Sequence, residues 1–408
     1  MKSNVQEKFE KNKVHITYED NFEYIISVAR YLLKMVAAWP LDDNVSTSER
    51  IYKYCMNVFL FALIIFFFAP SVLYAIFKTK STRVKIRIIS MILMNFANVI
   101  KYIFLLMHNK EIKICLYETK EDWKNIILRQ DYENMLSRGK LGRSLVILST
   151  CLIYGASLFN RVIIPLTKGN IIVNNVTIRR LPLPSYYIFF DVQKSPVYEF
   201  IYFAQIFTGF VVLIIASTVF ALTTYFIMHI CGQIDILIRE IQDIETANSD
   251  IGNADNLIHL TILHQIKSKS FLKKVTEIVQ YMCLAEIFFC MLSICVVFYA
   301  LNRDYTYSII SIIGYSIIII SFTFNLFIFC YIGELLDTQN MKVITISRTL
   351  GWHNLLLKSV KNLIIVILVA NDLQKLVPGK FVPLTLSNFT TMFKTAIGYF
   401  NFLRNTTS

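Results

Sequence analysis

One run of the chain, from Ile201 to Ile234, contains no Asp, Glu, Lys or Arg over 34 residues. As a single helix it would be roughly 50 Å long, whereas the hydrocarbon core of a bilayer is about 30 Å thick. Such a helix must either tilt strongly or project beyond the membrane and pack against protein there. We favour projection, because residues 235–278 have the pattern of an amphipathic helix that does not span a membrane.

The composition is that of a membrane protein. Hydrophobic residues make up 55% of the 408 residues and charged residues only 17%, whereas roughly a quarter of the residues of a soluble chain are charged. The formal net charge is +13, but the basic residues lie between apolar runs, where they flank a bilayer. We therefore expect a lipid bilayer, and no nucleic acid, as a partner. The polar first 20 residues lack the apolar core of a signal peptide.

Seven apolar runs predict an all-α membrane protein with seven transmembrane helices, since about 20 residues are enough to cross a bilayer. They are residues 57–77, 88–107, 144–164, 201–234, 279–301, 305–335 and 384–403. The fifth and sixth are so close in sequence that they must form an antiparallel pair. Residues 108–143 are interpreted as a polar connection. Lys101, near the end of the second run, is expected to extend its amine toward the headgroups.

Two further apolar segments are too short to span. The first ends at Trp39-Pro40 and is interpreted as an interfacial or re-entrant helix. Its expected apolar face consists of Tyr24, Ile25, Val28, Leu32, Met35, Val36 and Trp39. The second, residues 352–372, is interrupted by two lysines and is interpreted as a cytoplasmic helix buried against partner helices.

The distribution of basic residues predicts the orientation. With the N-terminus in the cytoplasm, 27 of the 41 Lys and Arg lie in cytoplasmic segments and 11 in outer segments. The positive-inside rule thus favours a cytoplasmic N-terminus and an outer C-terminus. The sequon at Asn175 would then lie outside, where a glycan can be attached, and the predicted outer loops contain no Cys.

The last predicted span differs from the others in being striped. Residues at alternating steps of three and four share one helix face, and here they are Asn388, Thr391, Thr395, Gly398, Phe402 and Asn405. Lipid cannot satisfy a polar stripe, so this face must meet protein or water. Two interpretations follow: packing on neighbouring helices through small and polar residues, or a pore-lining helix with Phe402 as its apolar constriction. Lys394, in the same run, is costly in a bilayer and therefore a functional candidate, as is Arg161.

The sequence gives no support for catalysis. It has no Gly-rich phosphate loop, no C-x-x-C pair and no pair of histidines at metal-ligand spacing. We expect no enzyme activity, no metal and no cofactor. Glu334 is expected to make hydrogen bonds within the cytoplasmic helical part of the chain rather than to act as a catalytic acid.

Several local motifs resemble those of the insect odorant receptors, and together they cover nearly the whole chain. They are Trp39-Pro40, EDW at 121–123, LPLPSYYIFFDVQKSPVYE at 181–199, HICGQIDIL at 229–237, FCYIGELL at 329–336 and FKTAIGYFNFLR at 393–404. The last two are the more specific. The related gustatory receptors would be expected to show Thr-Tyr and a late Gln-Phe, where this chain has Gly398-Tyr399-Phe400.

The resemblance implies an odorant-gated, non-selective cation channel in the plasma membrane of an olfactory neuron dendrite. In that family four subunits surround one pore, and each contributes its last helix. A tuning subunit assembles with a co-receptor subunit, and the cytoplasmic helix extensions form an anchor domain. Matching the C-terminal motif places the gate at Phe402 and a polar pore position at Asn405. The long insertion of the co-receptor is missing, so the chain is similar to a tuning subunit.

The resemblance also implies a pocket for a small volatile odorant between spans two to six, in their outer halves. Such a ligand binds mainly by burial of apolar surface. The candidates by position are Asn95, Asn98, Tyr154, Phe159, Phe203, Phe207, Met291, Phe298 and Tyr315. Ordinary helix packing is the alternative for each of them.

The expected organisation has four parts. Residues 1–50 are a cytoplasmic lead with the interfacial helix, 51–335 hold six spans and the pocket, 336–383 form the anchor helix, and 384–408 are the pore helix. Two other classes remain as alternatives, a G-protein-coupled seven-span chemoreceptor and a membrane enzyme or transporter. The first would have the reverse orientation, and the second would need a cluster of carboxylates or histidines within the spans.

Overall fold

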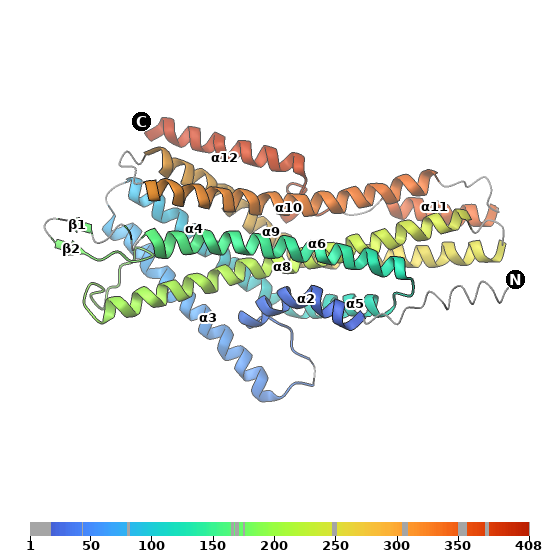
Figure 1. Cartoon of the computed structure of the whole chain (residues 1–408), viewed down its shortest axis with the longest axis horizontal. Helices are drawn as coiled ribbons and strands as arrows, with labels where there is room; N and C mark the ends of the chain where they lie inside the picture. Colours follow the sequence, from blue (N-terminus) through green and yellow to red (C-terminus); the bar gives the residue numbers. More distant parts are fainter. Residues whose placement is uncertain are drawn as a thin grey trace.

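The computed structural model describes residues 18–407, except residues 43, 80–81, 165–166, 168–170, 174–175, 247–250, 304–308, 350–356 and 372–374. The described chain is a bundle whose longest helices run along one long axis, while α3 lies obliquely to it (Figure 1). Its helices are α2 (Tyr18–Met35), α3 (Thr47–Leu73), α4 (Thr82–Met107), α5 (Asn109–Lys124), α6 (Arg129–Leu158), α8 (Val197–Thr246), α9 (Ile251–Arg303), α10 (Ile309–Thr349), α11 (Leu357–Asn371) and α12 (Leu386–Thr407). Short π-helical turns, Tyr74–Lys78 and Phe159–Ile163, extend α3 and α6, and a 3-10 turn, Pro378–Lys380, precedes α12. The strands β1 (Ile171–Val173) and β2 (Val176–Ile178) pair as an antiparallel hairpin.

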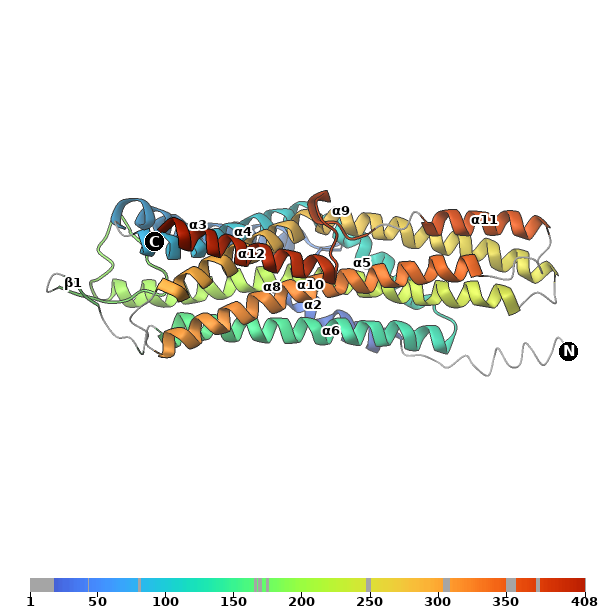
Figure 2. The same ribbon diagram turned by 90° about the horizontal axis from the view of Figure 1, so that it is seen from above.

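The charge-free run from Ile201 to Ile234 lies within one long helix. Helix α8 has 50 residues, so it is about 75 Å long at 1.5 Å per residue. Helices α9 and α10 are also overlong, with 53 and 41 residues. They extend together past the rest of the bundle to the end where α11 lies, while the β-hairpin and the C-terminus lie at the opposite end (Figures 1 and 2). The core follows α8 along its length, with Ile215, Phe226 and Ile241 fully buried.

Five helical segments of the described chain are long and apolar enough to cross a membrane, namely Thr47–Lys78, Arg129–Ile163, Val197–Ile244, Asp255–Asn302 and Ile312–Thr349. Helix α4 contributes a shorter apolar stretch, Ile92–Met107. Helix α12 is not among the five, because its Thr and Asn residues lower its mean hydropathy. Its 22 residues nevertheless make it about 33 Å long, enough for a bilayer core.

Residues 108–143, which were predicted as a polar connection, are largely helical. Helix α5 occupies residues 109–124, and α6 begins at Arg129 rather than at Ser144. The signal was an amphipathic pattern: Ile112, Cys115, Thr119 and Trp123 recur at helical spacing and are buried.

The predicted apolar face of the first helix is also partly wrong. Tyr24 and Met35 are 48% and 57% exposed, whereas Phe22, Ile26 and Leu33 are buried. Helix α2 packs on α5, α6 and α8, so its buried face is turned toward protein. The sequence pattern alone could not give that rotation, because apolar residues occur on both sides of the helix.

Two motifs that are distant in the sequence are joined by a side-chain contact between α5 and α8. Asp122, in the EDW motif, accepts from His229 of the HICG motif at 3.1 Å, and it also pairs with Lys267 on α9. The side chains of Asp122 and His229 are only 10% and 2% exposed. Burial alone would raise the pKa of Asp122, but the hydrogen bonds and charges of His229 and Lys267 hold that pKa below its ordinary value.

We predict that Asp122→Asn lowers the stability of the detergent-solubilised protein by about 1–3 kcal/mol at pH 7, because hydrogen bonds to a charged group are lost. The lowered pKa means that the contribution of Asp122 is fully present above the pKa of the unfolded chain. It is lost only as the pH falls below the ordinary pKa of an aspartate and through the still lower folded pKa. Thermal denaturation from pH 7 to pH 3 measures this.

Glu121→Gln is the matched control, because Glu121 pairs with Lys124 on the surface, where both side chains are more than 30% exposed. We expect it to change the stability by less than about 1 kcal/mol. An equal loss of stability in both variants would show that the buried contacts of Asp122 contribute no more than a surface ion pair.

Candidate functional site

Helix α12 packs on the bundle through one apolar face. Phe389 meets Phe327 of α10 with ring centroids 5.6 Å apart, and Phe400 meets Phe298 of α9 at 5.9 Å. Ala396, between them, is 1% exposed. The helix therefore lies along α9 and α10 at the edge of the described bundle (Figure 1).

The striped face of α12 is turned away from its own chain. Asn388, the first member of the predicted stripe, is half-buried, and its side-chain amide donates to the carbonyl of Pro383 at 2.8 Å. The members from Thr391 to Asn405 are exposed, and Phe402 is 65% exposed. A Cβ placed on Gly398 would meet no atom within 4 Å. The hydroxyl of Thr395 donates to the carbonyl of Thr391 at 2.8 Å, which leaves its remaining acceptor capacity directed outward. The structure thus brings the predicted pore residues together on one open face, and Lys394 beside them is also exposed.

The start of α12 is fastened to the FCYIGELL motif on α10. The Glu334 carboxylate accepts from the backbone N–H of Leu386 at 3.1 Å, which agrees with the expectation that this side chain makes hydrogen bonds. At the preceding Gly333 a side chain would collide with the carbonyl group of Leu384. The motif therefore combines a close backbone approach with an acceptor at a helix N-terminus, where the first N–H groups lack partners and negative charge is favoured.

The predicted ligand residues are only partly brought together. Asn95 lines a small cavity in the half of the bundle nearer the β-hairpin, with about 20 Å³ of free space. This cavity is lined by α3, α4, α6, α8 and Leu183 of the connecting segment. Asn98, one turn along α4, is 4% exposed, and its amide donates to Met94.

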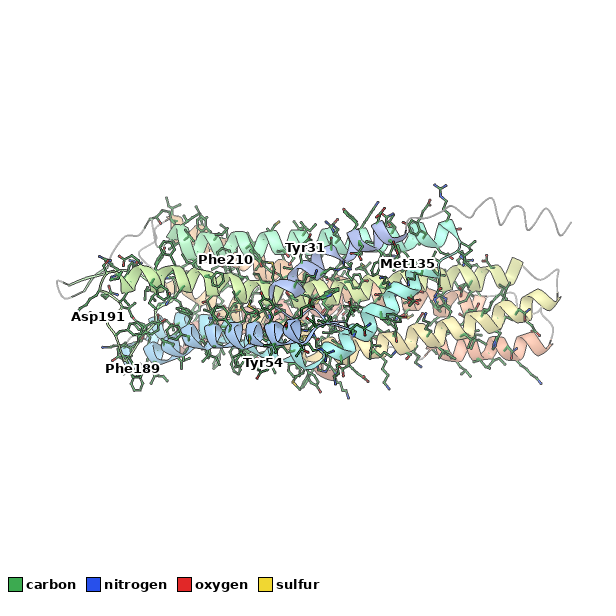
Figure 3. All side chains as sticks on the ribbon, turned by 90° about the horizontal axis from the view of Figure 1, so that it is seen from below. Tyr31, Tyr54, Met135, Phe189, Asp191 and Phe210 are labelled. Atoms are coloured by element: carbon green, nitrogen blue, oxygen red, sulfur yellow. The ribbon has the colours of Figure 1, made fainter. Side chains whose placement is uncertain are left out.

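Other predicted ligand residues belong to the packing of the bundle. The ring of Tyr154 lies 6.2 Å from that of Phe210, labelled in Figure 3. Phe159 lies near Gly314, Tyr315 is buried and Met291 packs against the main core. Phe298 contacts Phe400 of α12, so it connects the bundle with the striped helix.

Phe203 and Phe207 do not line the cavity beside Asn95. They are 69% and 55% exposed on α8 and face outward. Asn175, the predicted glycan acceptor, lies outside the described residues.

A buried ion pair was missed by the sequence reasoning. Lys101 on α4 is 2% exposed and pairs with Glu286 on α9, so the expectation that its amine reaches the headgroups is wrong. The other Glu286 oxygen accepts from Asn325 of α10 at 2.7 Å, and Asn325 also contacts Ser149 of α6 at 3.3 Å. The sequence did contain a signal for this pair. Lys101 and Glu286 have opposite charges and lie in two different predicted spans, and charges within a membrane usually pair with one another.

The comparison with protein families decides the class of this chain. Residues 81–397 match the family described as "7tm Odorant receptor". The chain belongs to this 7tm odorant receptor family. Among curated members, Odorant receptor 82a of Drosophila melanogaster is 25% identical over 229 residues, covering 56% of this chain and 58% of that protein. Odorant receptor 10 of Aedes albopictus is 26% identical over 236 residues, covering 56% and 60%.

The match therefore spans less than two thirds of these two odorant receptors. Among solved structures, the olfactory receptor OR5 from Machilis hrabei in complex with eugenol superposes with a TM-score of 0.80, covering 96% of this chain and all of that one. A second structure of OR5 superposes with a TM-score of 0.77. At 12% identity these structures establish the insect olfactory receptor fold for the chain. The odorant receptor family and fold are not those of enzymes.

We predict that Glu334→Ala loosens the first turn of α12. The charged acceptor at Leu386 contributes about 1.5–3 kcal/mol, so amide exchange at Leu386 should accelerate by roughly tenfold or more, while exchange in α8 stays unchanged. Hydrogen–deuterium exchange of the purified receptor measures both. Asp337→Asn is the control, because Asp337 pairs with the exposed Lys375. Unchanged exchange at Leu386 in Glu334→Ala would contradict the capping role.

We predict non-additive effects for the buried pair. Lys101→Met leaves the Glu286 charge buried without its cation, which costs about 3–5 kcal/mol. The double variant Lys101→Met/Glu286→Gln removes both charges and should be more stable than Lys101→Met alone. Thermal denaturation of the two singles and the double measures the coupling. Strictly additive losses would mean that the two side chains do not interact.

Proposed function

We propose that this odorant receptor is the odorant-binding subunit of a heteromeric, ligand-gated, non-selective cation channel. It would work with a co-receptor subunit in the dendritic plasma membrane of olfactory neurons. The observation that carries the proposal is the open polar face of α12, which is long enough to span a membrane and buries only its opposite side.

An exposed polar stripe on such a helix requires water or protein beside it, because lipid offers no hydrogen bonds. One helix cannot enclose a pore, so the stripe implies further subunits. A heterotetramer in which each subunit contributes its last helix would surround the stripe with water. Phe402 is then the apolar constriction, and Thr391, Thr395, Gly398 and Lys394 line the vestibule on the α10-anchored side, with Asn405 beyond the constriction.

The orientation follows from charge. The end of the bundle that holds α11 would be cytoplasmic, with the 27 basic residues of the inner segments. The β-hairpin, Asn175 and the C-terminus would be outside. The long extensions of α8, α9 and α10, together with α11, would form the anchor domain.

A small volatile odorant is the proposed ligand. OR5 from Machilis hrabei, which shares this fold, is described in complex with eugenol. In this chain the cavity lined by Asn95 is mostly apolar and lies between helices, as ligand sites in bundles do. Helix α4, which carries Asn95, packs on α9, and Phe298 links α9 to Phe400 of α12. A ligand that shifts α4 would therefore act on the pore helix through α9.

The test is a voltage-clamp recording from cells that express this chain together with a co-receptor subunit. We expect odorant-evoked cation current that persists when a guanine-nucleotide analogue blocks G proteins. Phe402→Ala should raise the current without odorant, because the apolar constriction is widened. Phe381→Ala is the matched control, since Phe381 is an exposed ring outside α12. A current abolished by the nucleotide analogue would refute the channel proposal.

A further inference from the structure

Arg161 is a charged residue within a helical segment that is apolar and long enough to span the membrane. It lies in the π-helical turn at the end of α6, inside the segment Arg129–Ile163. Arginine stays protonated in proteins, so the charge cannot be removed by deprotonation. Among the residues that the structure describes, no carboxylate and no hydrogen-bond acceptor pairs with its guanidinium group.

The guanidinium group points into the protein. It lies directly against Gly209 of α8, where a Cβ would collide with it. Together with Asn95 and Thr208 it lines the cavity of about 20 Å³. Because Gly209 has no side chain, the guanidinium group of Arg161 can lie there, between the end of α6 and α8.

The polar neighbours of Arg161 are already occupied. Both ends of the Gln205 amide are used, its oxygen by the N–H of Leu183 at 3.0 Å and its nitrogen by Ser185 at 2.7 Å. The Thr208 hydroxyl donates to Ala204 at 2.8 Å. The rest of the lining is largely apolar, from Ile64, Phe67, Phe68, Leu183 and Val212. The cavity thus combines one cation in need of an acceptor with apolar walls.

We propose that this cavity recognises an odorant with an anionic oxygen group, a short-chain carboxylic acid, whose carboxylate binds Arg161. A guanidinium group binds a carboxylate through two parallel hydrogen bonds, and the apolar walls receive the alkyl chain. The free space holds about one water-sized group, so the rings of Phe67 and Phe68 must move apart for the chain to enter. This inference rests on the proposed function, because it names the ligand class of the same receptor.

The experiment compares hexanoic acid with methyl hexanoate, which has a similar alkyl chain but no charge. In cells expressing the receptor and a co-receptor, the acid should evoke current at lower concentration than the ester. Arg161→Gln should raise the half-maximal acid concentration by roughly 10- to 100-fold and change the ester response by less than about twofold. Arg161→Lys should lie between, because it keeps the charge but loses the planar fork.

Two further variants control for the position of the charge. Gly209→Ala should reduce the acid response as Arg161→Gln does, because its Cβ displaces the guanidinium group. Arg179→Gln should leave the acid response unchanged, because Arg179 is an exposed residue paired with Glu199. Equal potency of acid and ester, or an acid response unaffected by Arg161→Gln, would overturn the proposal.

A binding measurement separates this proposal from the channel proposal. Hexanoate should raise the denaturation temperature of the receptor purified in phospholipid-free detergent, and Arg161→Gln should abolish that rise. If no ligand evokes current in any variant, the proposed channel function fails. The shift in denaturation temperature then tests the ligand class without any current measurement. If only added phospholipid stabilises the protein through Arg161, the anion is a lipid headgroup and the odorant proposal is refuted.

Discussion

The buried pair of Lys101 and Glu286 is the interaction on which the arrangement of the transmembrane helices depends. Charges in an apolar bundle are costly unless they are paired and their remaining hydrogen bonds are made. Here Glu286 is shared between Lys101 of α4 and Asn325 of α10, and Asn325 reaches Ser149 of α6. One carboxylate on α9 therefore fixes the positions of α4 and α10 directly and that of α6 through Asn325. A shift of any of these helices would break a hydrogen bond that lipid cannot replace.

The last helix is held differently, and this difference suits a moving part. Helix α12 is fastened at its start by Glu334 and by the close approach at Gly333, and along its length by aromatic contacts such as that of Phe400 with Phe298. No buried ion pair ties it to the bundle among the described residues. Apolar contacts lack the directionality of hydrogen bonds, so in the proposed channel they would let the helix turn or tilt about its fastened end.

The sequence predicted the features that depend on periodicity and length. The charge-free run from Ile201 gave the overlong α8, and the stripe from Thr391 to Asn405 proved to share one exposed face. Features that depend on which distant residues meet were missed. Nothing local shows that Lys101 faces Glu286 or that Arg161 lies on Gly209, because these contacts are set by helix rotation in the tertiary structure. Helix α2 was misjudged for the same reason.

The central claim is that the open face of α12 lines the ion pathway. Cysteine substitution along the helix, followed by a charged thiol reagent during odorant-evoked current, tests it most directly. The account predicts that Thr395→Cys and Phe402→Cys become sensitive to the reagent, while Ala396→Cys and the unsubstituted receptor do not. Sensitivity at Ala396 with none at Thr395 and Phe402 would contradict the claim, because the ions would then pass along the face that the structure buries.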